Sequence, residues 1–545
     1  MPSVTTIKIG GAAGQGVKSA GQLLAKLALR SGYQIYCHTE YGSLIKGGHN
    51  VIQVNVSKDP VTAPRKTTNF LVAFNQETID RYCGELLQGA GVLIDPKASI
   101  NIPSGLKKSG VCQVPLLSIA KETGSGDQGI NVVAVGAITA LLGGDLQLLK
   151  DVVKSAFADD SDMVVASNLK AVEGGYSYIV ANLAESVGKA LLPSNKVSPL
   201  MMVNCNEALA LGVIAGGLKF ASIYPMTPIT NLLTILASYQ EKYGFVFRQP
   251  EDEIAAINQA IGASYAGARS LVATSGGGFC LMTEGLGLAG MTETPLVVIE
   301  GMRPGPATGL PTWSEQGDLQ FVLHAHQGEF PRIVLAPGDV EEAFYLARQS
   351  FDLAEKYRLP VIILVDKNLC ESDQSCKVFD TNFSGGASRQ GLRPGDGAFF
   401  ITNSNEHDAT GFSSDKAYDH ISQTRRRMQK LVDCEKEDLP APVLYGPAKA
   451  TITIVSWGSN KGAILEALKS LPHANYLHLT WLNPFPRDSV VRILSQSERV
   501  VSIEANYSGQ LANLIQEKTG LGIVNRLLKY DGRPIYPEEI VEWCL

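Results

Sequence analysis

The 545-residue sequence predicts a multi-domain α/β protein built largely on parallel sheets. Short apolar runs alternate with glycine-containing turns and helix-like stretches along almost the whole chain. The 54 glycines suit a fold with many tight strand-to-helix turns. Hydrophobic residues make up 45% and charged residues 18%, which allows several large cores.

The first domain is expected at residues 1–195. TTIKIGG (5–11) predicts a strand, and a glycine-rich turn then leads into a helix. Buried strands are expected at NFLVAFN (69–75) and GVLIDP (91–96), and KALLPSNKVSPLM (189–201) reads as a linker. The predicted helix has an apolar stripe at helical spacing: Val17, Ala20, Leu23, Leu24, Leu27 and Ala28.

Two further domains are expected at residues 200–440 and 445–545. Repeated strand–turn–helix units in the second domain predict a parallel sheet with helices on both faces. An irregular polar stretch follows at about 371–411. The third domain opens with ATITIVSWGSNKGAILEALKSL and closes with RVVSIEANYSGQLANLIQEKTG, each again strand, glycine and helix.

Composition excludes several classes of protein. The net charge of −6 and the pI of about 5.9 argue against a nucleic-acid-coating protein. Nine cysteines without a CxxC argue against a disulfide framework or a zinc ribbon. No apolar run is long enough to span a membrane, and the first residues lack a signal-peptide pattern. A cytoplasmic protein is expected.

The loop from Gly10 to Gly16 invites a dinucleotide-binding interpretation. A fingerprint starting at Gly11 needs a glycine at position 13, which is alanine, although Glu40 ends the next predicted strand, where a ribose-binding acid would sit. The match is therefore weak. An anion at the helix N-terminus and a purely structural turn both remain open.

Two other patterns carry little chemistry. CESDQSC (370–376) has too few cysteines to hold an iron–sulfur cluster. RPGDGAFF resembles the start of a thiamine diphosphate metal motif, but the later window DHISQTRRR lacks the asparagine that this motif needs. Asp396 is therefore interpreted as a loop residue, and no metal ligand is assigned in this chain.

Three segments of the second domain are more informative together than alone. The stretch from Tyr224 to Thr230, YPMTPIT, places two prolines before a predicted helix, where they fix the backbone in advance. Glu253 lies in QPEDEIAAINQAIG, where acids would ordinarily cap a helix and face solvent. RPGPATGLPTWSEQGDLQ would alone be a Gly/Pro loop.

Together these segments resemble the 2-oxoacid:ferredoxin oxidoreductases, which are thiamine diphosphate enzymes. YPMTPIT resembles that family's YPITPST corner, QPEDEIAAINQAIGASYAGARSLVATSGGG its cofactor-activating segment, and RPGPATGLPT its GPSTGxPT loop. GAAGQGV with YGSLIKGGH resembles the family's gamma region, and SIEANYSGQL its C-terminal domain. The resemblance covers nearly the whole chain, in the order gamma then alpha.

The chain departs from the family pattern at several positions. Met226 and Ile229 replace the usual isoleucine and serine of the corner, and Ala307 replaces a serine of the loop. Ala12-Ala13 and Lys46 replace a glycine pair and an arginine in the gamma region. The changes at 229 and 307 each remove a hydroxyl near the expected substrate pocket, so they bear on the substrate more than on the chemistry.

The resemblance implies a gamma-type α/β domain, a pyrimidine-type thiamine diphosphate-binding domain and a transketolase C-terminal-like domain. It implies oxidative decarboxylation of a 2-oxoacid to an acyl-CoA with reduction of ferredoxin, or the reverse carboxylation. Glu253 would hydrogen-bond the cofactor's pyrimidine as the catalytic acid–base group. Ile254, Ile257 and Ile261 mark a buried face on its helix, and Ile254 would form an apolar wall behind Glu253. Further cofactor contacts are expected from Tyr224, Pro225, Gly276 and Gly277, with Thr227 both catalytic and substrate-binding.

The substrate is an anion, so the pocket needs a cation. Arg303 is one candidate, and Arg248 and Lys46 are others. An arginine suits a carboxylate because its guanidinium can bind it in bidentate fashion. Hydroxyls are expected from Thr230, Thr308 and Thr312. The fused gamma–alpha order resembles 2-oxoglutarate enzymes in particular, which favours 2-oxoglutarate and succinyl-CoA over pyruvate, branched-chain oxoacids or indolepyruvate.

Neither a diphosphate–Mg²⁺ site nor an iron–sulfur site is found in the sequence. Both are expected on a beta subunit, which would clamp the cofactor against this chain in a dimer of heterodimers. Ferredoxin is the expected electron acceptor and coenzyme A the co-substrate. An NAD-linked dehydrogenase and a non-catalytic scaffold remain as alternatives.

Overall fold

The computed structural model describes residues 4–42, 47–104, 110–183, 199–382, 393–397 and 401–545. Within them the chain forms two compact units. The first is Met1–Val203 with Ser372–Val378 and Tyr536–Glu538, and the second is Asn204–Glu371, Phe379–Ile535 and Glu539–Leu545. Most of the linker expected at 189–201 lies outside the described residues, and no described helix is long and apolar enough to cross a membrane.

The first unit is built on a mixed sheet of eight strands in the order β6-β5-β4-β1-β3-β2-β14-β7. β1 runs parallel to β4 but antiparallel to β3, and β3 separates β1 from β2. The strands are β1 Val4–Ala12, β2 Gln34–Glu40, β3 His49–Ser57, β4 Thr68–Ala73, β5 Leu86–Ile94, β6 Val111–Gln113, β7 Leu200–Val203 and β14 Gln374–Lys377. A dinucleotide fold needs its first two strands side by side, so this topology does not favour the NAD alternative.

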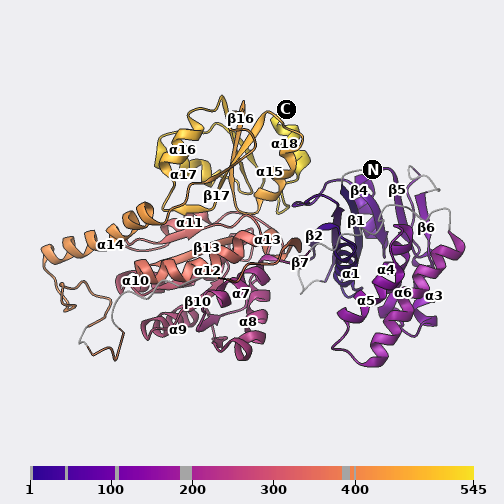
Figure 1. Ribbon diagram of the computed structural model, residues 1–545, viewed down its shortest axis with the longest axis horizontal. Coiled ribbons are helices and arrows are strands. Elements are labelled where there is room, and N and C mark those ends of the chain that lie inside the picture. The colour runs from indigo at the N-terminus through magenta and orange to yellow at the C-terminus, as the bar shows by residue number, and fades with distance from the viewer. Residues whose placement is uncertain (1–3, 43–46, 105–109, 184–198, 383–392, 398–400) are drawn as a thin grey trace. The chain divides into compact units, whose positions relative to one another are not determined.

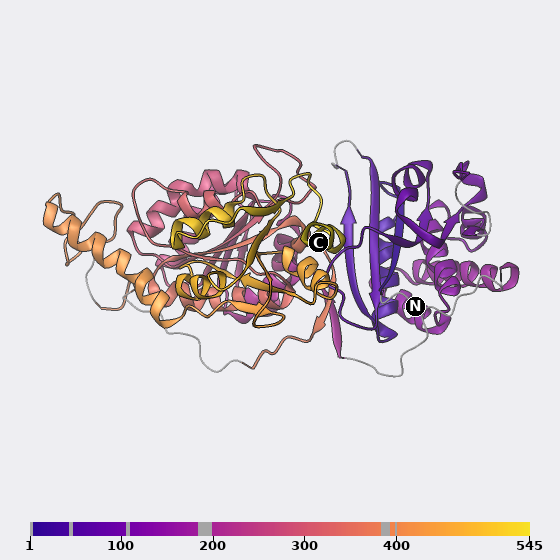
Figure 2. The same ribbon diagram turned by 90° about the horizontal axis from the view of Figure 1, so that it is seen from above.

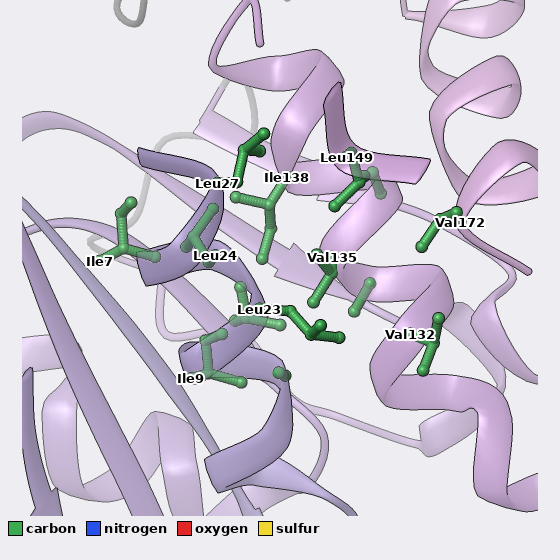
Figure 3. Close-up of a cluster of buried hydrophobic side chains, with 14 of the residues drawn as sticks. Ile7, Ile9, Leu23, Leu24, Leu27, Val132, Val135, Ile138, Leu149 and Val172 are labelled. Carbon is green, nitrogen blue, oxygen red and sulfur yellow. The ribbon is translucent and has the colours of Figure 1, made fainter. Parts of the chain in front are cut away.

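Helices pack on one face of this sheet, as Figure 2 shows. They are α1 Val17–Arg30, α3 Leu116–Glu122, α4 Ile130–Leu141, α5 Leu146–Ala156 and α6 Asp162–Asn182, while the short α2 (Gln76–Tyr82) contacts the opposite face. All six residues of the apolar stripe predicted for α1 are buried. Leu23 and Leu27 of α1 meet Val135 and Ile138 of α4 in the core drawn in Figure 3.

The second unit contains the predicted parallel sheet, whose strand order is β18-β12-β13-β11-β10-β8-β9. Six of its strands run parallel, and β18 is antiparallel at one edge. The strands are β8 Phe220–Ile223, β9 Val246–Arg248, β10 Ser270–Thr274, β11 Leu296–Met302, β12 Ile333–Leu335, β13 Pro360–Asp366 and β18 Trp481–Asn483. Its central strands are buried apolar runs, as expected for a sheet covered on both faces.

Helices cover both faces of this sheet (Figure 1). α9 and α10 pack on one face and α7 and α12 on the other, where the backbone of Phe344 approaches Gly212 closely. The helices are α7 Cys205–Ala215, α8 Thr230–Tyr243, α9 Glu253–Tyr265, α10 Gly276–Met291, α11 Leu319–His324, α12 Val340–Tyr357 and α13 Lys367–Glu371.

A smaller five-stranded sheet completes the second unit, in the order β15-β17-β16-β19-β20. Its strands and the remaining helices are α14 Ala417–Glu437, β15 Val443–Tyr445, β16 Ile452–Trp457, α15 Asn460–Leu468, β17 Ala474–Leu479, α16 Arg487–Leu494, β19 Arg499–Glu504, α17 Gln510–Thr519, β20 Asn525–Leu528 and α18 Pro537–Cys544. Its core is continuous with that of the seven-stranded sheet, because Trp457 and Leu477 belong to the same buried cluster as Val298 and Leu364. The α/β class predicted from the sequence is confirmed.

Candidate functional site

Four segments meet at the carboxyl edge of the seven-stranded sheet. The corner from Tyr224 follows β8, the turn before Glu253 follows β9, the glycine run from Gly276 follows β10, and the loop from Arg303 follows β11. Because β8, β9, β10 and β11 are parallel, these segments all lie at the same edge. The carboxyl edge of an open parallel sheet is where α/β proteins bind ligands.

Glu253 points into the protein at the first residue of α9. Its side chain is 3% exposed, and its Oε1 is buried without a hydrogen-bond partner among the described residues. Asp252 performs the capping instead, because its carboxylate accepts a hydrogen bond from the amide of Ala255 at 2.8 Å. The sequence alone suggests that the acids at this helix start cap the helix and face solvent. That description fits Asp252 but not Glu253.

The buried face of α9 differs from the one predicted. Ile257 and Ile261 are buried as expected, but Ile254 is 48% exposed. The expectation that Ile254 forms an apolar wall behind Glu253 was therefore wrong. Adjacent residues of a helix point about 100° apart, so turning Glu253 inward turns Ile254 outward.

Glycines at the start of α10 make room for the Glu253 carboxyl. A Cβ atom on Gly278 would lie 2.4 Å from Glu253 Oε1 and 2.1 Å from Thr274 Oγ1. Gly276 faces the other side, where an added Cβ would lie 2.5 Å from Asp318 Oδ2. The glycine run is thus required by close packing, and it places the N-terminus of α10 beside an orphaned buried carboxylate oxygen.

Arg303 joins the loop after β11 to the proline-containing corner. Its Nη1 donates a hydrogen bond to the carbonyl of Thr227 at 3.0 Å, and burial lowers the pKa of its guanidinium. Pro228 and Ile229 are packed against Gly301 of β11. Because the Ile229 side chain is fully buried there, this departure from the family pattern lies in the core and not on an open pocket surface.

The other predicted site residues take varied positions. Tyr224 and Pro225 are half-buried in the corner, and Thr230 is exposed at the start of α8. Thr308 is exposed in the loop after β11 and Thr312 is buried. Two further positions complete the set: Gly277 is exposed at the start of α10, near the carbonyl of Ala307, and Arg248 is exposed at the end of β9. Lys46 lies outside the described residues.

Two acids were missed by the sequence reasoning, the buried Glu300 of β11 and the half-buried Asp318. They lie close enough for their carboxyl groups to interact. Burial, and then the neighbouring Asp318, raises the pKa of Glu300 well above its usual value, and burial likewise raises that of Asp318. Neither Glu300 oxygen has a hydrogen-bond partner among the described residues, so burial favours the protonated form of this carboxyl. An acid inside the apolar run LVVIEG was the available signal.

This arrangement fits the pyrimidine half of a thiamine cofactor better than a metal site. The unpartnered Oε1 of Glu253 is an acceptor for a ring nitrogen, and the exposed glycine Gly277 lets a flat ring approach the backbone. No group of three or more potential metal ligands occurs among the residues that the structure describes. Asp396 hydrogen-bonds the amide of Arg393 at 2.8 Å within its own loop, as expected.

Three protein-family models match the chain in sequence. Residues 211–436 match the thiamine diphosphate-binding domain of pyruvate flavodoxin/ferredoxin oxidoreductases, and residues 6–178 match the pyruvate ferredoxin/flavodoxin oxidoreductase family. Residues 450–540 match core domain II of pyruvate:ferredoxin oxidoreductase. The predicted site residues from Tyr224 to Thr312 all lie within the first of these regions.

Full-length relatives agree. The chain is 31% identical to the alpha subunit of a 2-oxoacid:ferredoxin oxidoreductase from Saccharolobus solfataricus, over 98% of this chain and 96% of the relative. It is 28% identical to the 2-oxoglutarate oxidoreductase subunit KorA of Mycobacterium tuberculosis, over 98% and 90% of the two chains. A solved structure of 2-oxoglutarate:ferredoxin oxidoreductase from Magnetococcus marinus superimposes with a TM-score of 0.92, at 30% identity and 99% coverage of both chains.

The site, the family matches and the full-length relatives together confirm the resemblance read from the five motifs. The relatives are alpha subunits, so the enzyme has more than one kind of subunit. This chain belongs to the 2-oxoacid:ferredoxin oxidoreductase family, as an alpha subunit with an N-terminal gamma-type region and a thiamine diphosphate-binding domain.

Proposed function

We propose that this chain supplies the pyrimidine-binding half of the active site of a 2-oxoglutarate:ferredoxin oxidoreductase. The enzyme would convert 2-oxoglutarate and coenzyme A to succinyl-CoA and CO₂ while reducing ferredoxin, or run in reverse. The assignment of 2-oxoglutarate as the substrate rests on the full-length likeness to the Magnetococcus marinus enzyme. That enzyme was solved with 2-oxoglutarate, coenzyme A and succinyl-CoA bound. The likeness to KorA supports the same substrate.

Glu253 is the proposed acid–base residue. Bound thiamine diphosphate supplies a nucleophilic carbon and an electron sink. The buried Oε1 of Glu253 has no partner among the described residues. It would hold a hydrogen bond to the pyrimidine nitrogen and move a proton at that atom. Close packing against Gly278 keeps the Glu253 carboxyl in one position. Acid–base catalysis requires such pre-organisation.

The remaining site residues have proposed roles at the same edge. Tyr224, Pro225, Gly276 and Gly277 contact the cofactor, and Thr227 presents its hydroxyl to the reacting centre. Proposed contacts to the substrate carboxylates come from Thr227, Thr230, Arg303, Thr308, Thr312 and Lys46. Arg303 has one of its five N–H groups on the carbonyl of Thr227, which aims the guanidinium while leaving further donors for an anion.

A beta subunit is the proposed partner. It would hold the cofactor's diphosphate through Mg²⁺ and carry a [4Fe–4S] cluster that passes electrons to ferredoxin, in a dimer of heterodimers. We place the domains at 1–195, 200–440 and 445–545. The nine cysteines are all free thiols, which supports a reducing compartment such as the cytoplasm.

The test is 2-oxoacid-dependent reduction of a viologen dye by this chain co-purified with its beta subunit, over a panel of 2-oxoglutarate, pyruvate, a branched-chain oxoacid and indolepyruvate. Activity should require thiamine diphosphate and be highest with 2-oxoglutarate. Highest activity with pyruvate would contradict the substrate. Activity without thiamine diphosphate would contradict the proposed chemistry as a whole.

The role of Glu253 is tested in the same assay. Glu253→Gln should lower kcat by about 10²–10⁴-fold, since it removes a transferable proton and keeps the side chain's shape. Glu251→Gln is the matched control, because Glu251 lies two residues earlier and is exposed. The control should retain wild-type activity. Similar kcat values for the two variants would remove Glu253 from the mechanism.

A further inference from the structure

The loop that carries Arg303, Thr308 and Thr312 is held at its far end by the lobe built on the five-stranded sheet. The side chain of Arg533 stacks on Trp313 with 3.3 Å to the ring centroid, and the amide of Ser314 donates to the carbonyl of Gly532 at 3.1 Å. The proposed substrate loop therefore lies between two layers of the second unit and takes its fixed points from the C-terminal one.

Gln316 is the centre of this attachment. It is fully buried, and its amide donates to the carbonyl of Ala505 at 2.7 Å. Its side-chain oxygen accepts hydrogen bonds from Asn460 Nδ2 at 2.7 Å and from the amide of Ala505 at 3.1 Å. Its side-chain nitrogen donates to the carbonyl of Trp457 at 3.2 Å and faces Asp366 Oδ2 at 3.4 Å.

The residues that hold Gln316 are themselves fixed by Glu504. The buried Glu504 carboxylate accepts hydrogen bonds from the amides of Leu511 and Ala512 at 2.7 and 3.0 Å, which are orphan donors at the start of α17. It also accepts from Asn506 Nδ2 at 3.0 Å, and the same nitrogen faces the carbonyl of Gln316 at 3.2 Å. The segment SIEANYSGQL thus holds the loop through hydrogen bonds to Gln316.

Gln510 of the same segment also hydrogen-bonds the loop and the helix that follows it. Its Nε2 donates to the carbonyl of Gly317 at 2.6 Å, and its Oε1 accepts from the amide of Gln320 at 2.8 Å. Asp318 lies between these two held residues. Its carboxyl is therefore fixed against Gly276, at the start of the helix whose Gly278 contacts Glu253.

We infer that Gln316 is a positioning residue, through which the C-terminal lobe sets the place of the 303–318 loop and, by way of Asp318, the start of α10 against which Glu253 rests. That the positioned residues form an active site rests on the proposed function. The positioning itself is a property of this chain's hydrogen bonds. It assigns the SIEANYSGQL sequence an internal role instead of direct contact with a ligand.

The test uses Gln316→Met in the co-purified enzyme, since methionine keeps the length of the side chain and removes its hydrogen bonds. Asn475→Leu is the matched control: Asn475 is 3% exposed in the same lobe, and its Nδ2 donates to the carbonyl of Pro447 at 3.0 Å, away from the loop. Both variants should lower the thermal midpoint. Gln316→Met should in addition lower kcat by about 10–100-fold, because small misplacements at a reacting centre are costly.

Hydrogen exchange gives a readout that does not depend on activity. In Gln316→Met, the amides of residues 303–318 and 276–282 should exchange faster than in wild type, whereas Asn475→Leu should leave both segments unchanged. Gln510→Met, at a half-buried position, should produce the same pattern more weakly and serves if Gln316→Met does not fold.

The outcomes separate the two claims. Unchanged kcat and unchanged exchange in the two segments, with a lowered midpoint alone, would show Gln316 to be merely structural and would overturn the inference. Failure of the wild-type enzyme to reduce viologen with any 2-oxoacid would instead overturn the proposed function, while faster exchange in Gln316→Met would still support the positioning.

Discussion

At the scale of single residues, the site depends on the absence of a side chain at Gly278. The space that a side chain would fill there is occupied by Glu253 Oε1 and Thr274 Oγ1, at 2.4 and 2.1 Å from an ideal Cβ position. A buried carboxylate oxygen without a partner is costly in an isolated chain. We interpret that cost as the consequence of a site that is completed by its ligand.

Gly278→Ala should therefore push the Glu253 carboxyl out of place. We expect kcat to fall by about 10²-fold, the scale of a small misplacement of a reacting group, while the variant still folds. Gly287→Ala on the same helix is the control, because no atom lies within 4 Å of its added Cβ and alanine favours helix. Steady-state kinetics and thermal midpoints distinguish the two, and equal kcat values would contradict the packing argument.

The Glu300–Asp318 pair predicts a dependence of stability on pH. The pKa of Glu300 in the folded chain lies well above its usual value of 4.5, so above pH 4.5 the folded state holds more protons than the unfolded state. The thermal midpoint should consequently fall as pH rises through that window. Glu300→Gln keeps a donor for Asp318 and does not titrate, so its midpoint should vary less with pH. An identical pH profile for the two proteins would contradict the raised pKa of Glu300.

At the scale of elements, a partly buried ion cluster joins α12 to the five-stranded sheet. Lys461 of α15 bridges Asp339 and Glu342 at the start of α12, and His478 of β17 contacts Glu342 at 2.9 Å. Burial opposes the charge on Glu342, but His478 and Lys461 outweigh it and lower its pKa to about 2. This cluster contributes to holding together the two layers between which the 303–318 loop lies.

Lys461→Met should destabilise the second unit by about 1–3 kcal/mol, because it leaves two half-buried carboxylates without this cation. Lys518→Met is the control, since Lys518 pairs with Glu517 at the surface and such pairs contribute about 0–1 kcal/mol. Urea unfolding of both variants measures the difference. Equal stabilities would show that the cluster does not join the two layers.

The lowered pKa of Glu342 also predicts the direction in which stability changes with pH. Its contribution to stability is fully present above pH 4.5 and is lost as pH falls toward 2, because the folded state then resists protonation that the unfolded chain accepts. Glu342→Gln should flatten the acid limb of the wild-type stability profile, measured by thermal midpoint against pH. An acid limb unchanged by the substitution would place the acid sensitivity elsewhere.

At the scale of the whole molecule, local patterns predicted most of the fold and part of the site. The stripe from Val17 to Ala28 and the strand–turn–helix repeats depend on neighbouring residues, so periodicity reveals them. The role of Glu253 was found through a resemblance, and Ile254 shows that spacing alone misplaced the first residue of the buried face.

What the sequence could not provide lies in contacts between distant segments. Gln316 and Ala505 are 189 residues apart, and no pattern along the chain pairs them. The Glu300–Asp318 pair joins a strand to a loop in the same way. The order of strands in the first unit, with β3 between β1 and β2, likewise follows from sheet pairing and not from any one segment.

The most direct test of the central claim is the rate at which the thiazolium C2 proton of thiamine diphosphate exchanges with D₂O on the co-purified enzyme, followed by quenching and proton NMR. If the Glu253 carboxyl activates the cofactor, this exchange should be slower in Glu253→Gln by about 10²–10⁴-fold and unchanged in Glu251→Gln. Equal exchange rates for wild type and Glu253→Gln would contradict the account, whatever happens to overall turnover.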